Sequence, residues 1–296
     1  MKTDRFKSFY KHLPFLDIKE LIDYFAVFDS YFDLDQLKRY DNLLDNIKYN
    51  IVYMYDDLKK EFDFTDDESL NSDIQTLLYR LAIGTRKHYS IYKDLSHVRG
   101  KVAYSYLFKY NILFTESSRE KPIIKIANQP LKKELRGYKI EDKMRFSKEF
   151  YRFWFTFIYP NRHLLANGEY NEVIKQIEDN LDYFISLFFE EISNSLLNSI
   201  YKGRVVESGA YWDKDVEIDL LVRLDDGTTI VGECKYKNHK ISKNTLNKLQ
   251  KVAFKADIKV DTFALFSKNG FSNELIRLKN DKLLLFDLED FKRLLL

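Results

Sequence analysis

The sequence contains very little cysteine, proline and glycine. A single cysteine, Cys234, occurs among 296 residues, so no disulfide can form within the chain and a zinc site made of cysteines is excluded. This usage suits a reducing compartment, and we expect a cytoplasmic protein. The four prolines and nine glycines, with abundant Lys, Asn, Ile, Tyr and Phe, are typical of proteins from AT-rich genomes. The aromatic count alone therefore indicates no function.

The chain also lacks an excess of charge and a long hydrophobic run. Its 48 basic and 46 acidic residues leave a formal net charge of only +2, so any surface that binds nucleic acid has to be local. All apolar runs are far shorter than the ~20 residues of a membrane helix, and we expect no membrane partner. Charges and Pro14 interrupt the N-terminal segment, which is not the pattern of a signal peptide.

The spacing of apolar residues predicts an α+β protein. Hydrophobic residues at 45% and charged residues at 32% are typical of globular chains. Helical spacing dominates the first two thirds of the chain, and period-two spacing dominates the last third. We expect four parts: an N-terminal helical segment (1–65), a winged-helix-like unit (66–128), connecting helices (129–180) and a sheet domain (181–296).

The second part shows three short helical patterns followed by two β-rich runs. The helical patterns are SDIQTLLYRLAIG, TRKHYSIYKDL and SHVRGKVAYSYLFKYN, and the β-rich runs are ILFTES and PIIKIAN. This is the order of a winged helix-turn-helix, whose third helix offers Arg99, Lys101 and Lys109 to DNA phosphates or base edges. The same fold often serves as a protein–protein or spacer module, so both interpretations stay open.

Helical patterns lie on both sides of this part. Residues 17–32 and 37–62 have apolar residues at helical spacing and no internal Gly or Pro. The run KMRFSKEFYRFWFTFIYPN predicts an aromatic helix closed at Pro160, with rings that form core rather than a base-stacking platform. Residues 169–200 predict one or two amphipathic helices.

The sheet domain carries carboxylates inside two neighbouring strands. The runs VEIDLLVRL and TIVGECKY are joined by DDGT, and Asp-Gly is a strong signal for a tight turn between antiparallel strands. Alternation places Asp219 on the face of Leu221, and it places Glu233 and Lys235 together with Cys234 facing away. The hairpin therefore brings Asp219, Glu233 and Lys235 onto one surface, where the two acids are near enough to share a cation.

Such a pair of carboxylates favours a divalent metal. Close carboxylates raise each other's pKa unless a positive charge lies between them. Mg²⁺ or Mn²⁺ prefers oxygen ligands, and the main-chain carbonyl of Cys234 could complete the set. A metal held there acidifies a bound water and neutralises phosphate charge, while Lys235 can orient the attacking water or the phosphate. We expect the Cys234 thiol to be a buried apolar group rather than a nucleophile.

This arrangement resembles the PD-(D/E)XK nuclease superfamily. The superfamily motif is an acidic residue on one strand and Asp/Glu-x-Lys on the next, matched here by Asp219 and by the triplet 233–235. The proline of the first half-motif is absent, and Ile218 stands in its place. The superfamily often adds a Glu from the helix before the sheet, where FFEEISNSLL offers Glu190 and Glu191. We choose Glu190, which directly follows the aromatic pair, so the resemblance implies metal ligands Glu190, Asp219 and Glu233.

A second resemblance covers more of the chain. The runs FYRFWFTFIYPN, FFEE, GAYWDKDVEIDLLV and GECKYKN are similar to the C-terminal region of archaeal-type ATPases, over roughly residues 70–296. In that family an AAA-type ATPase is followed by a winged helix and a nuclease-like domain of unassigned function. This chain has no GxxxxGK[ST], and residues 1–65 are too few for an ATPase module, so we expect no bound nucleotide. A separate ATPase remains a possible partner.

The segment 235–259 is strongly basic. Besides one acid, Asp257, the segment contains eight lysines: Lys235, Lys237, Lys240, Lys243, Lys248, Lys251, Lys255 and Lys259. As a helix with a flanking loop it can follow a phosphate backbone, with Lys248 and Lys251 as candidates, or it can be an ordinary solvated lysine face. The histidines are scattered and receive no metal role.

Two hypotheses follow from these patterns. The leading one is metal-dependent hydrolysis of DNA phosphodiester bonds by Asp219, Glu233, Lys235 and Glu190. The alternative is a non-catalytic DNA-binding or interaction protein that keeps a nuclease-like scaffold. A protein partner or a homo-oligomer is compatible with either.

Overall fold

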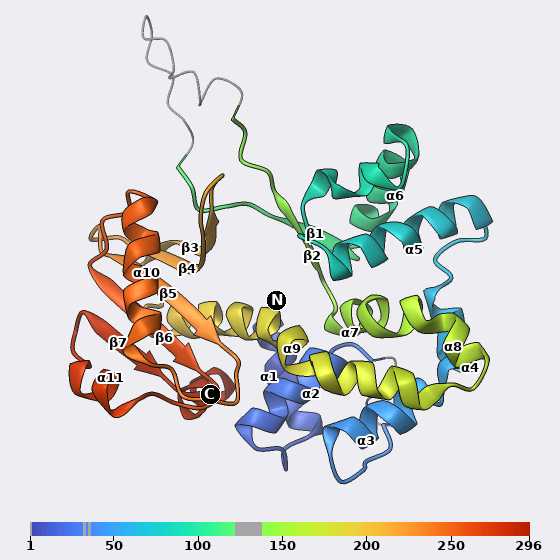
Figure 1. Ribbon diagram of the computed structural model, residues 1–296, viewed down its shortest axis with the longest axis horizontal. Helices are drawn as coiled ribbons and strands as arrows, with labels where there is room; N and C mark the ends of the chain where they lie inside the picture. The colour runs from blue at the N-terminus through green and yellow to red at the C-terminus, as the bar shows by residue number, and fades with distance from the viewer. Residues whose placement is uncertain (1, 32–33, 35–36, 122–137) are drawn as a thin grey trace, which may run out of the picture. The chain divides into compact units, whose positions relative to one another are not determined.

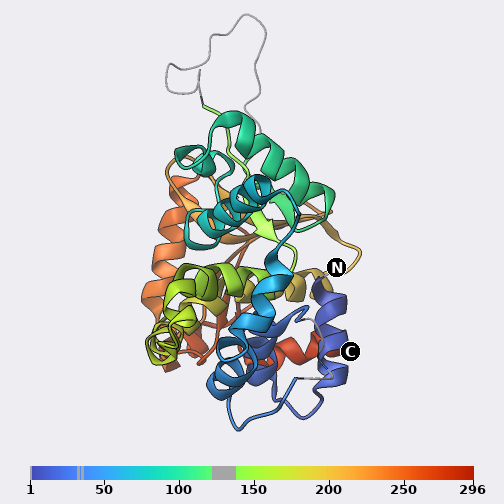
Figure 2. The same ribbon diagram turned by 90° about the vertical axis from the view of Figure 1, so that its right-hand side faces the viewer.

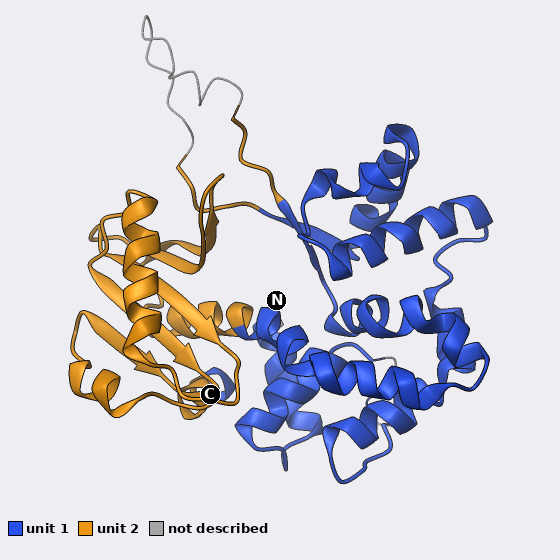
Figure 3. Ribbon diagram, viewed as in Figure 1, with its two compact units in different colours: residues 1–116, 143–189, 294–296 blue, residues 117–142, 190–293 orange. Residues whose placement is uncertain are grey.

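The chain forms two compact units in the computed structural model, which describes residues 2–31, 34, 37–121 and 138–296 (Figure 1). Unit 1 comprises residues 1–116, 143–189 and 294–296, and unit 2 comprises residues 117–142 and 190–293 (Figure 3). The four-part division stays a prediction, because a compact unit can contain more than one domain. No helix in the described ranges combines the length and the apolar character that crossing a membrane requires.

Unit 1 is helical except for one short β-ribbon. Its first half contains α1 (Lys2–His12), α2 (Ile18–Phe28), α3 (Leu43–Ile47), π-helix η2 (Lys48–Val52), α4 (Tyr55–Leu58), η3 (Lys59–Phe62), α5 (Glu68–Ile83), η4 (His88–Lys93) and α6 (His97–Lys109). Its second half contains α7 (Glu149–Phe153), π-helix η6 (Trp154–Ile158), η7 (Tyr159–Asn161), α8 (Arg162–Ala166) and the first part of α9 (Tyr170–Ile200). The helix expected over 169–200 is confirmed by α9. Of the segment 17–32, only Ile18–Phe28 forms a helix among the described residues, and the pattern over 37–62 becomes a run of four short helices from Leu43.

The prediction for residues 143–146 is wrong. They were expected to begin the aromatic helix, but they form strand β2 (Lys143–Phe146), antiparallel to β1 (Leu113–Glu116). The partner strand supplies the reason, because buried Arg145 forms an ion pair with Glu116 at 2.7 Å. The expected strand at 122–128 lies outside the described residues. The aromatic residues that follow β2 are core, as predicted: Phe150, Phe153, Trp154 and Phe155 are all at most 2% exposed.

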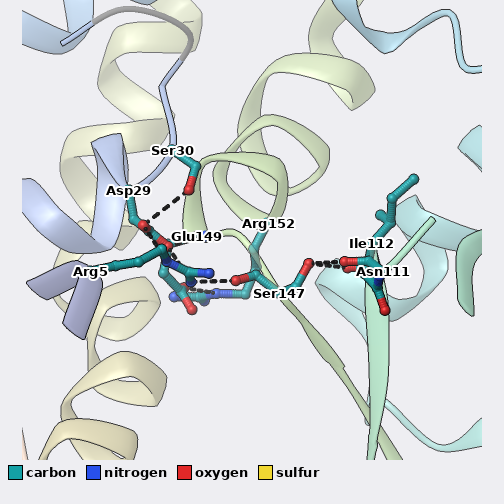
Figure 4. A network of polar contacts seen from close by, with 8 residues as sticks. All are labelled: Arg5, Asp29, Ser30, Asn111, Ile112, Ser147, Glu149 and Arg152. Atoms are coloured by element: carbon teal, nitrogen blue, oxygen red, sulfur yellow. Dashed lines mark hydrogen bonds and ion pairs between the residues drawn. The ribbon is translucent and has the colours of Figure 1, made fainter. Parts of the chain in front are cut away.

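Three buried charges of unit 1, on Asp29, Glu149 and Arg152, belong to one network (Figure 4). Arg5 Nη2 lies 2.9 Å from Asp29 Oδ2, and the same carboxylate accepts the backbone N–H of Glu149 at 3.2 Å. Arg152 Nε donates to Glu149 Oε2 at 2.7 Å, and the guanidinium lies 3.7 Å from the ring centre of Phe184. These contacts join α1, α2, α7 and α9, and they satisfy charges that would otherwise be costly to bury.

Unit 2 is built on a five-stranded mixed sheet of order β3-β4-β5-β6-β7. Its elements are β3 (Val205–Trp212), β4 (Glu217–Leu224), β5 (Thr229–Lys235), α10 (Lys243–Lys255), β6 (Thr262–Ser267), α11 (Asn273–Leu278), β7 (Leu283–Phe286) and the 3-10 helix η8 (Leu288–Leu295). Strands β3, β4 and β5 are antiparallel neighbours, whereas β6 and β7 run parallel to β5. The helical unit and the sheet unit together make an α+β protein, as the sequence predicts.

The β4–β5 hairpin and helix α10 position the residues of interest. Gly227 has φ of +86° in the tight turn, which only glycine adopts at low cost, and Leu221 pairs with Val231 as the Asp-Gly signal predicts. Figures 1 and 2 both show α10 along one face of this sheet. Its apolar residues Leu246, Leu249 and Ala253 recur at helical spacing, and they pack into the hydrophobic cluster that includes residues of β4 and β5.

Candidate active site

Strand β4 contains a β-bulge at Asp219. The register between β3 and β4 shifts between two pairs: Gly209 with Leu221, and Tyr211 with Ile218. Asp219 and Leu220 therefore face a single residue of β3, Ala210, which is the arrangement of a bulge. Ile218 and Leu221 both belong to the hydrophobic cluster that packs against α10, although strict alternation would place them on opposite faces. The alternation expected from the sequence fails here, and the bulge redirects the Asp219 side chain.

The Asp219 carboxylate joins β4 to β5 beyond the end of their main-chain pairing. That pairing reaches Leu220 and Gly232, and two residues further along β5 the backbone N–H of Cys234 donates to Asp219 Oδ2 at 2.8 Å. A side-chain oxygen thus accepts a hydrogen bond at the point where the ladder stops. The contact holds Asp219 directly beside the E-x-K triplet.

The surroundings of Asp219 strongly favour its protonated form. Burial is the largest cause that raises the pKa of Asp219 well above its usual value, and the charges of Glu190 and Glu233 raise it further. Lys235 and the Cys234 N–H lower the pKa, but they do not compensate. The charge of Glu190, on α9, thus acts on Asp219.

Glu233 and Lys235 form an ion pair at the end of β5. Their side chains are 22% and 33% exposed, so the pair lies partly within the protein. Burial by itself lowers the pKa of Lys235, but the charges of Glu233 and Asp219 outweigh it and raise this pKa. Lys235 is consequently a permanent cation among the three acids at neutral pH.

Cys234 behaves as the sequence predicts. It is 6% exposed, and burial raises the pKa of its thiol, with further contributions from the charges of Asp219 and Glu190. A thiol with a raised pKa stays protonated at neutral pH and is a poor nucleophile. The contribution of Cys234 to this region is its backbone N–H.

The donor set fits a hard divalent cation in its chemistry. Carboxylate oxygens are the ligands that Mg²⁺ and Mn²⁺ prefer, and a buried acid with a raised pKa gains from a nearby cation. Across residues 2–31, 34, 37–121 and 138–296, however, no three His, Cys, Asp or Glu residues are gathered closely enough to hold a metal ion. Glu233 lies against Lys235 instead, so metal binding requires this side chain to move.

Of the residues of α6 that were predicted to contact DNA, Arg99 is held in an ion pair, whereas the two lysines are exposed. Arg99 donates from Nε to Asp73 Oδ2 at 2.8 Å, and Asp73 is only 4% exposed. The guanidinium of Arg99 is thus held by α5, which the sequence alone does not show because the two residues are far apart in the chain. The Lys109 ammonium lies 5.3 Å from the ring centre of Tyr110, and Lys101 is exposed.

Helix α10 exposes the predicted Lys248 and Lys251 and one residue that the sequence reasoning missed. Phe254 is 87% exposed, and it lines a shallow surface hollow with Asn247, Gln250 and Lys251. Helical spacing was the signal that could have identified it, because residues three and seven positions before Phe254 share its face of the helix.

Comparison with known proteins gives two matches and no activity. Residues 154–249 match a family described as "Archaea bacterial proteins of unknown function". The matched segment runs from η6 to the middle of α10 and includes the whole candidate site. A search of curated proteins finds no match.

Among solved structures, the chain is similar to protein VC1899 from Vibrio cholerae. The two are 16% identical, with a TM-score of 0.28, and the similarity covers 87% of this chain and 56% of that protein. The chain thus spans little more than half of that structure, and a similarity of this size supports no conclusion about fold or function.

Proposed function

We propose that unit 2 is a metal-dependent nuclease domain that hydrolyses DNA phosphodiester bonds. The observation that carries the proposal is partly buried Asp219, which accepts the Cys234 N–H beside the ion pair of Glu233 with Lys235 and whose pKa is raised by burial and by the charges of Glu190 and Glu233. A carboxylate with a strongly perturbed pKa and identified charged neighbours is typical of functional sites. The helix, the hairpin, the E-x-K strand and the following helix also occur in the order that the PD-(D/E)XK resemblance implies.

Each residue has a role in this proposal. Glu190, Asp219 and Glu233, with the carbonyl of Cys234, would hold Mg²⁺ or Mn²⁺, which supplies an acidified water and neutralises charge on the phosphate. Lys235 holds the scissile phosphate or orients the attacking water through its permanent positive charge. The protonated Cys234 thiol contributes no chemistry. The backbone N–H of Cys234 keeps the Asp219 carboxylate in place.

Two finer assignments belong to the same proposal. We propose that residues 66–128 act as a winged-helix-like DNA-binding unit, in which α5, η4 and α6 precede β1, while β2, outside this range, completes the β-ribbon. Within this unit exposed Lys101 and Lys109 are the candidate phosphate contacts, because Arg99 is held by Asp73. We also propose that a separate ATPase of the archaeal type is a partner, since the chain resembles the C-terminal region of such ATPases and lacks their nucleotide-binding motif.

A cleavage assay with a matched set of variants tests the nuclease. Supercoiled and linear DNA are incubated with Mg²⁺ or Mn²⁺ and with wild type, Asp219→Ala, Lys235→Ala and the control Glu217→Ala, which changes an exposed acid of the same strand. We expect loss of cleavage in the first two variants and wild-type cleavage in the control. Equal cleavage by all four proteins would show a contaminating nuclease and contradict the proposal.

The ion pair of Glu233 with Lys235 specifically favours a second candidate, a non-catalytic DNA-binding or interaction protein. In that case the lysine compensates the acids structurally and no metal is needed. Calorimetric titration with Mn²⁺ separates the two, because it measures binding without turnover. Heat of binding that disappears in Asp219→Ala supports the nuclease, and DNA binding that needs neither metal nor carboxylates supports the second candidate.

A further inference from the structure

The outward face of α10 presents an isolated aromatic ring. Phe254 is 87% exposed, whereas the other large apolar residues of the helix, Leu246 and Leu249, are at most 7% exposed. An exposed phenyl ring of this kind contributes nothing to the core and leaves apolar surface in water. Single exposed apolar side chains are common on protein surfaces, so the chemistry around the ring decides whether it can bind a ligand.

Amides and one cation share the helical face of this ring, and a second cation, Lys248, lies further round the helix, one turn before Lys251. Asn247, Lys248, Gln250 and Lys251 are exposed, and Asn247, Gln250 and Lys251 line the hollow next to Phe254. No Asp or Glu occurs from residue 236 to residue 256. Within the described part of the chain, neither Lys248 nor Lys251 has a carboxylate partner, unlike Lys243, which pairs with Glu274 at 3.0 Å. The face is thus positive and polar around a single apolar ring.

The chemistry of this face selects among possible occupants. A docked protein helix needs several apolar contacts at helical spacing, and α10 offers only one ring. A base pair in a duplex is stacked on both sides, so the ring could reach it only by opening the stack. An unpaired base offers an open π-face to Phe254, while its flanking phosphates suit Lys248 and Lys251.

We propose that the outward face of α10 binds single-stranded DNA, with one unpaired base stacked on Phe254 and the backbone held by Lys248 and Lys251. Asn247 and Gln250 hydrogen-bond to the edge of the stacked base. The inference rests on the proposed function, since it gives the nuclease a substrate class, namely DNA with unpaired nucleotides. The site differs from the carboxylates of β4 and β5, so the two can fail separately.

Fluorescence anisotropy with labelled dT20 and a 20-base-pair duplex tests the proposal. The measurements use the full chain in EDTA, where no divalent metal is available for cleavage. Phe254→Ala is expected to weaken dT20 binding roughly 5- to 150-fold and to change duplex binding less than about twofold. The control Ile276→Ala, which removes another exposed apolar side chain of unit 2, is expected to bind dT20 as wild type does.

A second variant, which keeps an aromatic ring at position 254, tests the proposal without relying on the alanine substitution. Phe254→Trp preserves the stacking surface and should bind dT20 within about twofold of wild type. The natural tryptophans, Trp154 and Trp212, are 2% and 5% exposed, so quenching by dT20 reports mainly on position 254. Wild-type affinity of Phe254→Ala for dT20, or unchanged Trp fluorescence on saturation, would overturn the proposal. If the protein cleaves no DNA but Phe254→Ala still weakens dT20 binding and dT20 still quenches Phe254→Trp, only the proposed nuclease activity is contradicted, and the single-strand site is supported.

Discussion

The backbone N–H of Cys234 donates a hydrogen bond to Asp219 Oδ2 at 2.8 Å, across the end of the β4–β5 hairpin. This contact fixes a carboxylate whose protonated form is favoured by burial and by two neighbouring acids. The same bulge that redirects Asp219 brings it beside the E-x-K triplet. When Asp219 is charged although its surroundings favour the protonated form, the folded state loses stability, and this loss can be measured.

Asp219→Asn should stabilise the protein at pH 7 to 8. A carboxyl whose folded-state pKa is raised costs no stability below the unfolded-state pKa of about 4, and its penalty grows as pH rises toward the folded-state pKa. Asn keeps an oxygen for the Cys234 N–H and removes this penalty. Urea unfolding should therefore show an advantage of Asp219→Asn over wild type that is large at pH 8 and small near pH 4. An equal or lower stability of the variant at pH 8 would contradict the raised pKa.

Lys235→Met should destabilise the protein by about 1–3 kcal/mol at pH 7, because it leaves Glu233 and Asp219 without their cation. The loss should shrink at pH 4, because Asp219, whose pKa is raised, is then protonated. A double-mutant cycle checks the cause, since Lys235→Met should cost less in an Asp219→Asn background. Identical costs in both backgrounds would mean that Lys235 does not act on Asp219.

Glu190 and Glu191 should differ in their effect on metal binding. Glu190→Gln removes a carboxylate near Asp219, and we expect Mn²⁺ affinity and DNA cleavage to fall roughly 10- to 100-fold. Glu191→Gln changes the adjacent residue of the same helix and should leave both within about threefold of wild type. The reverse order of effects would show that the second acid of FFEE is the ligand.

Arg152→Met should cost about 3–5 kcal/mol of stability, because Glu149, 1% exposed, would lose the guanidinium that compensates its charge in the core of unit 1. The double variant Glu149→Leu with Arg152→Met should recover most of this loss. Arg80→Met serves as the control, since its partner Asp94 is 30% exposed and the pair should contribute at most about 1 kcal/mol. Denaturant unfolding of the four proteins measures these differences, and a double variant as unstable as Arg152→Met would contradict the pairing.

Elements whose signals lie within a few neighbouring residues could be predicted from the sequence. The Asp-Gly turn, the alternation along β5 and the helical spacing of α10 all depend on neighbouring residues, so the hairpin, the burial of Cys234 and the exposure of Lys248 and Lys251 were predictable. Recognising the E-x-K triplet needed only the order of three residues on one strand.

The tertiary structure alone decided features that depend on a distant partner. The bulge at Asp219 arises from pairing with β3, the strand at 143–146 forms against β1, and Arg99 is held by Asp73. In each case the competing local pattern was plausible, but burial against another element lowered the free energy more than the local preference did. Alternation along β5 already placed Glu233 and Lys235 on one face, but only the structure shows that the two side chains form an ion pair.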